Sequence, residues 1–466
     1  MKQAITEGEP STFLGRVRAS LAPAGLPSDD RGRMRLVVDN LMLHLHPTKV
    51  NTRSLRLSYT WGLGGLSAML VMLLATTGIL LTNNYTPSPA EAYQSILNLR
   101  SNVWFGDFLR NLHHWAANLL VLAAALHLLR VFFTGAFRPP RAFNWLLGLA
   151  LLLLAVAANF TGYLLPWDQL AYWAITVATS LLTYIPIVGG VISRTLLGGP
   201  EVGAATLRNF YSLHIGVIPA SMILLMSFHF WRVRKDGDLS VPRAPGEPPA
   251  VKLEKVTTIP FLVRRELAFA LVWLALLVAW AMWVPAPLEG IANPQVSPNP
   301  AKAAWYFLGL QELLLHFHPL VAAVLIPAAA LLGLAALPFA DYRAESTGIY
   351  FRSRSGRRLA VLATGLALLI TPVWVVLDEF VVKWAEWFPA WPTLITSGLL
   401  PLAALVFGLL LLDELFSRFG ASIEERILAL VIFLAVAFVV LTAIGIFFRG
   451  PGMGLFWPWA MPAGHG

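Results

Sequence analysis

The chain has 466 residues, of which 57% are hydrophobic and 13% are charged, with a formal net charge of +9. A soluble domain averages about 25% charged residues, so this composition excludes an ordinary soluble enzyme. The chain contains no cysteine, which excludes disulfides, iron–sulfur ligation, thiolate metal sites and thioether-linked prosthetic groups within it. Because the positive charge lies between apolar blocks, it indicates orientation in a membrane, and no nucleic-acid binding is expected.

Nine apolar segments are long enough to cross a hydrocarbon core about 30 Å thick. They lie near residues 59–81, 113–133, 145–165, 210–233, 267–284, 319–338, 359–377, 393–412 and 427–448. These blocks predict an all-α integral membrane protein, a bundle of about eight or nine transmembrane helices. Residues 1–30 lack a basic stretch followed by an apolar one, so no cleavable signal peptide is expected.

Lysine and arginine are concentrated at one end of these segments. Nine of them precede the first span, and the connections after the fourth and sixth spans are also rich in them. The connections after the first, third, fifth and seventh spans hold at most two each. The positive-inside rule therefore predicts a cytoplasmic N-terminus and, with nine spans, a C-terminus outside. We expect a multi-pass protein of the bacterial inner (cytoplasmic) membrane.

Two outer connections, 166–209 and 285–318, are long and hold aromatic residues, and long ordered connections tend to carry function. The Pro-rich, charged stretch 234–255 is typical of a linker. The predicted divisions are a cytoplasmic N-terminal segment (1–56), a four-helix transmembrane domain (57–233), a cytoplasmic linker (234–265), a C-terminal transmembrane domain with an outer loop (266–380), and additional transmembrane helices with a tail (381–466).

Four histidines lie in two of the predicted spans, His113 and His127 in the second and His214 and His229 in the fourth. Fourteen residues turn an α-helix about 40° short of four full turns, and fifteen residues pass four turns by about 60°. Each pair therefore lies on roughly one helix face, with its members ~21–23 Å apart along the axis. Both spans run from outside to inside, so His113 should face His214 near the outer side and His127 should face His229 near the inner side.

Two facing imidazoles at each level are what a six-coordinate haem iron needs, and such an iron transfers electrons because no position is open to oxygen. We therefore predict that His113, His127, His214 and His229 bind two non-covalent b haems in a four-helix core. A lone histidine in a transmembrane helix is more often a packing residue or proton relay, but four at matched depths favour ligation. His114 points about 100° away from His113 and is predicted not to be a ligand.

Four glycines repeat the fourteen-residue period, namely Gly64 and Gly78 in the first span and Gly148 and Gly162 in the third. A glycine lets a porphyrin plane approach the backbone, although small residues also serve helix packing. Arg110 and Arg130 each lie three residues from a predicted ligand. They are candidates to pair with haem propionates, and a snorkelling interfacial arginine is the alternative.

At these residues the sequence resembles cytochrome b of the respiratory and photosynthetic bc complexes, over about residues 40–380. The matching stretches are His113 with His127, Gly162-Tyr-Leu-Leu-Pro-Trp-Asp168, Asn209-Phe-Tyr-Ser-Leu-His214 and Trp305-Tyr-Phe307. The spacing of fifteen residues in the fourth span resembles the photosynthetic branch, in which two polypeptides divide near the linker. Here the two parts are joined in one chain.

The resemblance implies a Q cycle. Quinol would be oxidised at an outer site between the 166–178 region and the loop with Trp305 and Tyr306. One electron would pass to a Rieske iron–sulfur protein and then to a c-type cytochrome subunit. The other would pass through the outer and then the inner haem to quinone on the cytoplasmic side. Membrane lipid and a second copy of the complex, as a homodimer, are further implied partners.

The sequence departs from the family at the outer loop. The family usually has Pro-Glu-Trp-Tyr, in which the Glu accepts a quinol proton, whereas this chain has Ala303-Ala304-Trp305-Tyr306. A carboxylate is the natural acceptor at neutral pH, and Glu312, Asp168 and Glu289 are the candidates to replace it. A solvated or ion-paired carboxylate is the alternative for Glu312. With no cysteine, the covalent extra haem of the photosynthetic branch is not expected in this chain.

Two other functions are alternatives for such a chain. A dihaem membrane anchor of a quinone-linked dehydrogenase would have fewer spans and no Trp-Tyr loop. A non-redox transporter would bind no haem and would have polar residues at broken helices near the midplane.

Overall fold

The computed structural model describes residues 27–39, 46–237, 239–247, 254–340 and 347–462. Within these residues, nine helices are long and apolar enough to cross a membrane, which confirms the predicted all-α membrane fold. They are α4 (Leu63–Thr82), α6 (Gly106–Phe133), α7 (Ala142–Tyr163), the continuous α10–η3–α11 (Ala204–Lys235), α12 (Thr258–Trp283), η4–α14–η5 (Leu320–Phe339), α15 (Arg354–Phe380), η6–α17 (Ile395–Arg418) and α18 (Ile423–Phe447).

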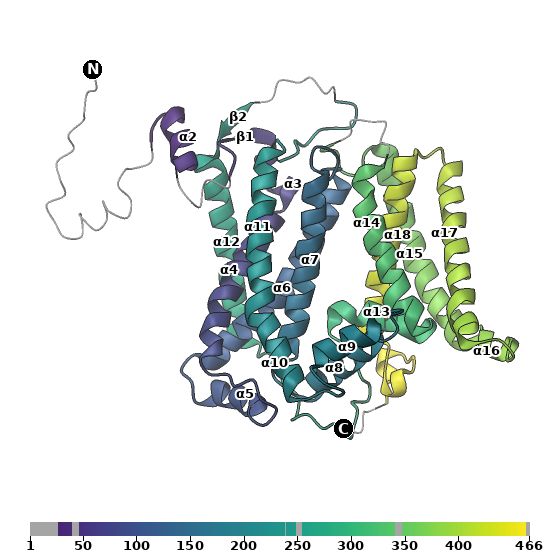
Figure 1. Cartoon of the computed structure of the whole chain (residues 1–466). Coiled ribbons are helices and arrows are strands. Elements are labelled where there is room, and N and C mark those ends of the chain that lie inside the picture. Colours follow the sequence, from purple (N-terminus) through teal and green to yellow (C-terminus); the bar gives the residue numbers. More distant parts are fainter. Residues whose placement is uncertain (1–26, 40–45, 238, 248–253, 341–346, 463–466) are drawn as a thin grey trace, which may run out of the picture.

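The shorter elements lie at the two ends of the bundle (Figure 1). The N-terminal face holds α2 (Asp30–Asp39) and the antiparallel pair β1 (Lys49–Asn51) and β2 (Lys255–Thr257). The opposite face, here called the loop face, holds α5 (Ala92–Ser101), α8 (Gln169–Leu182), α9 (Gly189–Leu197), α13 (Trp305–His316) and α16 (Trp384–Trp387). The two long connections therefore lie on one face, as expected; the first is largely helical, whereas the second is helical only over α13.

The strand pair was not predicted, and it links two predicted segments. β1 precedes the first span, while β2 follows the linker, of which residues 238 and 248–253 lie outside the described ranges. Tyr59 also contacts the linker, since its hydroxyl lies 2.6 Å from Ser240 Oγ. Of the predicted segment 1–56, residues 1–26 and 40–45 lie outside the described part of the chain.

Three of the spans contain a π-helical segment just before a proline. The segments are η3 (Leu213–Val217), η4 (Leu320–Leu325) and η6 (Ile395–Leu399), and the prolines are Pro219, Pro327 and Pro401. Proline lacks the amide hydrogen of a helix, and its ring clashes with the carbonyl four residues earlier. The wider turn of a π segment moves that carbonyl away, so each helix continues past its proline.

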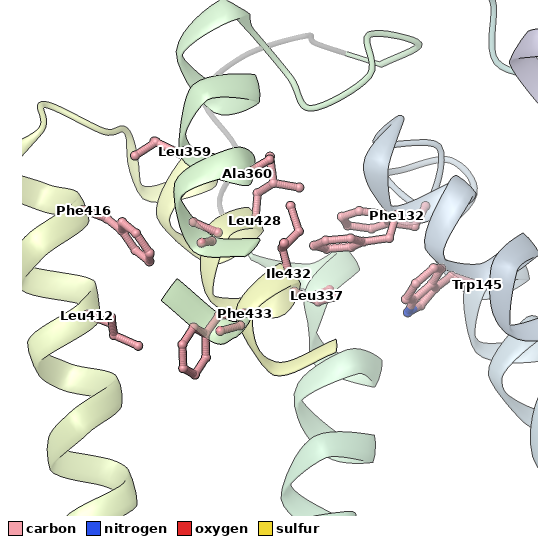
Figure 2. Packing of buried hydrophobic residues seen from close by; sticks show 14 of the residues in the cluster. Phe132, Trp145, Leu337, Leu359, Ala360, Leu412, Phe416, Leu428, Ile432 and Phe433 are labelled. Carbon is pink, nitrogen blue, oxygen red and sulfur yellow. The ribbon is translucent and has the colours of Figure 1, made fainter. Parts of the chain in front are cut away.

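Two apolar cores hold the bundle together. The first lies among α4, α6, α7, α11 and α12 and includes Leu70 and Ala116. The second joins the first spans to the last ones near the N-terminal face (Figure 2). There Phe132 of α6 and Trp145 of α7 pack in one cluster with Ile432 of α18. The two halves of the chain therefore form a continuous packed body, because apolar area is buried between them.

Candidate functional site

Two of the four predicted ligands meet near the loop face. His113 lies about two turns into α6 from its loop-face end, and His214 lies in η3. Their ring centroids are 6.2 Å apart, with the ring planes at 73°. The expected pairing of His113 with His214 is therefore present in the structure.

Each of these histidines faces a glycine of the next helix. A Cβ added at Gly78 of α4 would lie 3.2 Å from Cε1 of His113, and one added at Gly162 of α7 would lie 2.6 Å from Cε1 of His214. Contacts this short leave no room for a side chain beside the rings. The four residues thus form one level, with a glycine behind each imidazole.

The same arrangement recurs toward the N-terminal face. A Cβ at Gly64 would lie 3.2 Å from Cε1 of His127, and one at Gly148 would lie 3.7 Å from Cε1 of His229. The fourteen-residue periods of glycine and histidine therefore match, helix by helix, at two depths of the bundle. The glycines were predicted from their spacing alone, and each one lies against a predicted ligand.

The π segment η3 accounts for the unequal histidine spacings. A π turn accommodates one extra residue, so the fifteen residues from His214 to His229 rotate this helix about as far as fourteen residues rotate a regular α-helix. The two spans thus present their histidines in nearly the same relative orientation. Sequence reasoning treated the fourth span as a regular helix, and the signal that it missed was Pro219, just after the π segment.

The chemistry of these donors fits a bis-histidine haem. Among the described residues, no hydrogen bond engages Nε2 of His113, His127, His214 or His229. A threonine hydroxyl lies against Nδ1 of His113 and of His214. Neutral imidazoles with a free Nε2 are suited to iron, and the glycines give the imidazoles room against the neighbouring helices.

The two predicted propionate partners are both buried. Arg110 donates to the carbonyls of Ala286 and Pro287, at 2.9 and 2.6 Å, so it ties α6 to the second long connection. Arg130 donates from Nε to the carbonyl of Tyr59 at 2.9 Å, and its Nη2 is buried without a partner among the described residues. A buried guanidinium nitrogen with no acceptor suits an acidic group of a ligand.

His114 has contacts of its own. Its Nε2 lies 3.2 Å from Nδ2 of Asn118, and the Oδ1 of Asn118 accepts a hydrogen bond from Nε1 of Trp305 at 2.7 Å. Trp305, at the start of α13, therefore reaches α6 one turn beyond the histidine level near the loop face. This brings the second long connection next to the ligand helix.

Tyr306 is buried beside the end of α7. Its neighbour Phe307 stacks edge-on against Phe160 at 5.6 Å between centroids. The Tyr306 hydroxyl is buried and has no hydrogen-bond partner in the described part of the chain. Burial, reinforced by the nearby Tyr163, raises the pKa of Tyr306. The hydroxyl therefore stays protonated and is available as a donor to a ligand oxygen.

Asp168 joins the two long connections. Its Oδ1 caps α8 by accepting from the amide of Ala171 at 2.9 Å, and its Oδ2 accepts from the amide of Glu289 at 3.0 Å. Burial raises the pKa of Asp168, although these amides and Arg110 counteract the rise. A carboxylate with a raised pKa is better matched to accepting a proton near neutral pH than an ordinary one.

Glu312 lies in a buried ionic cluster, as its ion-paired alternative expected, although the sequence did not identify its partners. Arg449 binds Glu312 and also donates to Glu379 at 3.0 Å. His316 bridges Glu312 and Asp378, with Nε2 at 3.3 Å and Nδ1 at 2.7 Å respectively. Burial acts to raise the pKa of Glu312, but the hydrogen bonds from His316 and Arg449 outweigh it, so the net pKa is lowered.

The fold and the site together define a class: a multi-span helical membrane protein whose four-helix core holds histidines, each against a glycine, at two depths. The family description "Cytochrome b/b6/petB" matches residues 49–237. Cytochrome b6 of Heliomicrobium gestii is 39% identical over 192 residues, which cover 41% of this chain and 88% of that protein. Cytochrome b6 of Cyanidium caldarium is 39% identical over 208 residues, which cover 45% of this chain and 94% of that protein. The chain belongs to the cytochrome b/b6 family.

The similarity to solved structures extends further along the chain. A structure described as "Hyperthermophilic respiratory Complex III" has a TM-score of 0.62 at 21% identity, covering 90% of this chain and 97% of the other. At that identity the comparison shows a shared fold. It includes the second half of the chain, which lies outside the matched family region.

Proposed function

We propose that this chain is the cytochrome b subunit of a Rieske/cytochrome b complex, which oxidises quinol at the loop face and reduces quinone at the N-terminal face. The observation that carries the proposal is the repeated pairing of a histidine with a glycine at two depths of the bundle. A transporter does not require such a repeat. Membership of the cytochrome b/b6 family also supports the proposal.

Two non-covalent b haems would supply one-electron transfer across the low-dielectric core. His113 and His214 would hold one haem and His127 and His229 the other, each through Nε2. The glycines at positions 64, 78, 148 and 162 would give each ring its place beside the helix backbones. Arg130 would bind a propionate through its unpartnered Nη2. Arg110, whose guanidinium also donates to the carbonyls of Ala286 and Pro287, would do the same at the other level.

Quinol would bind where α13 meets α7 and α8. The Tyr306 hydroxyl is a free donor for a quinol oxygen, and Trp305 forms the wall toward α6. Asp168 is favoured over Glu312 as the proton acceptor, because Glu312 is already paired with Arg449. Asp168, in the first long connection, would thus replace the family's usual Glu as the proton acceptor.

The remaining parts follow from the family resemblance and the charge distribution. The loop face would be the outer side of a bacterial inner membrane, and the N-terminal face would be cytoplasmic. A Rieske protein and a c-type cytochrome would receive one electron of each quinol, and the other electron would cross the membrane to quinone. The net result is proton release outside and uptake inside, in a complex that is expected to be a homodimer.

The experiment is a reduced-minus-oxidised visible spectrum combined with an activity assay of the assembled complex. We expect b-type bands equivalent to two haems per chain and quinol-dependent reduction of a c-type acceptor. A spectrum without haem would instead support a transporter. Two haems without reduction of the acceptor would support a dehydrogenase anchor.

A further inference from the structure

The last span, α18, lies outside the matched family region and crosses α13 at close range. A Cβ added at Gly309 of α13 would lie 2.8 Å from the Phe438 ring and 2.8 Å from Thr442 Oγ1. One added at Gly445 of α18 would lie 3.2 Å from Cβ of Leu308. Contacts this short leave little room for a side chain at either position. One glycine from each helix therefore brings the two backbones together.

The segment that precedes α13, residues 299–304, is tied to the end of the same span. Lys302 Nζ donates to the carbonyl of Ile446 at 2.9 Å. This carbonyl belongs to the last turn of α18, where carbonyls lack partners within the helix and where the helix dipole favours a cation. Asn299 Oδ1 accepts from the amide of Gly452, in the turn after the span, at 2.5 Å. Two side chains of the segment thus bind backbone groups at the end of α18.

A third side chain holds the segment from α13 itself. Gln311 Oε1 accepts from the amide of Ala303 at 2.7 Å, and Gln311 Nε2 donates to the carbonyl of Ala301 at 2.6 Å. One amide side chain therefore fixes the backbone on both sides of Lys302. The point at which α13 begins is set by these contacts together with those to α18.

We propose that Asn299, Lys302 and Gln311 are positioning residues for quinol oxidation. The proposal rests on the function proposed above. The three side chains would act through the backbone of the segment that they bind, and that backbone places Trp305 and Tyr306 in the quinol site. None of the three needs to contact quinol. A misplacement of about 1 Å at a reacting group can cost roughly 10²-fold in rate, so a small shift of this backbone is enough to matter.

The sequence at this point explains why such contacts are useful. Where the family usually has Pro-Glu before the Trp-Tyr pair, this chain has two alanines. A proline fixes its own backbone angle and has no amide hydrogen, whereas an alanine is freer and carries an amide donor. The amide of Ala303 is the one that Gln311 binds. Side-chain hydrogen bonds would thus supply the rigidity that a proline would give at this position.

The experiment measures kcat and KM for quinol oxidation in the assembled complex with Lys302→Met, which keeps a long side chain and removes its donor. We expect KM to rise about 3–10-fold, as for the loss of one hydrogen bond, with kcat, haem spectrum and thermal stability nearly unchanged. Gln311→Leu should act in the same way, and Lys302→Arg should restore the wild-type KM. Lys383→Met is the matched control, because Lys383 also donates to a backbone carbonyl, that of Glu379 at 2.6 Å, but at the end of α15.

A further variant keeps the test decisive if Lys302→Met does not assemble. Asn299→Ala removes the other contact with the end of α18 and should also raise KM. Unchanged KM values in all the variants that assemble, or an equal rise in Lys383→Met, would overturn the inference while quinol oxidation itself continues. A wild-type complex that oxidises no quinol would instead remove the proposed function.

Discussion

Arg449, which follows the last span, binds Glu312 of α13 through both carboxylate oxygens. Its Nε lies 3.0 Å from Oε1 and 3.1 Å from Oε2, and its Nη2 lies 2.6 Å from Oε1. Both residues are only 1% exposed. The additional helices at the C-terminal end, whose role was open from the sequence, therefore fasten the helix that begins with Trp305 and Tyr306.

The first prediction concerns this ion pair. Removing one partner of a buried pair leaves an uncompensated charge and typically costs about 3–5 kcal/mol. We expect Glu312→Gln and Arg449→Gln each to lower the thermal stability of the detergent-solubilised protein, measured by loss of helical circular dichroism. The double variant should be more stable than the sum of the single losses predicts. Strictly additive losses would show that the pair contributes no coupling.

The second prediction concerns the proton acceptor. Asp168 must be ionised to accept a proton, and its pKa is raised, so the quinol oxidation rate should fall as the pH falls through that pKa, above the ordinary value of 3.8. Asp168→Asn should slow the reaction about 10²–10⁴-fold and abolish this dependence. Glu312→Gln should keep the wild-type pH profile. If Glu312→Gln loses the wild-type pH dependence and Asp168→Asn keeps it, Glu312 and not Asp168 is the proton acceptor.

The fold and the site were predictable from the sequence to different extents. The spans and the two histidine levels follow from apolar block length and helical periodicity, both of which are local properties. The β1–β2 pair joins residues about 200 positions apart and leaves no local signal in such short strands. Arg449 was missed for a similar reason, since its partners Glu312 and Glu379 come from other helices.

The third prediction concerns the glycines. Gly162→Ala would place a methyl group 2.6 Å from His214 Cε1, so we expect loss or strong perturbation of one haem, measured as haem per protein. Gly64→Ala should act on the other haem. Gly65→Ala is the matched control for Gly64, because a Cβ there meets no atom within 4 Å. Equal haem loss in the variants at positions 64 and 65 would argue against a specific role for Gly64.

The fourth prediction concerns the π segment. Pro219→Ala restores an amide donor and removes the ring that the π turn accommodates. If the segment then becomes α-helical, His214 rotates by about 100° relative to His229. We expect a changed low-spin electron paramagnetic resonance signal for one haem only. Pro327→Ala and Pro401→Ala, in spans without a predicted ligand, serve as controls and should leave both signals unchanged.

The most direct test of the central claim is the haem content of variants of adjacent histidines. In purified full-length protein, we expect two haems per chain in the wild type and in His114→Leu. His113→Leu and His214→Leu should each lose the same haem, and His127→Leu and His229→Leu should each lose the other. Two haems retained in the variants of all four histidines, or loss of a haem in His114→Leu alone, would contradict ligation by these two pairs.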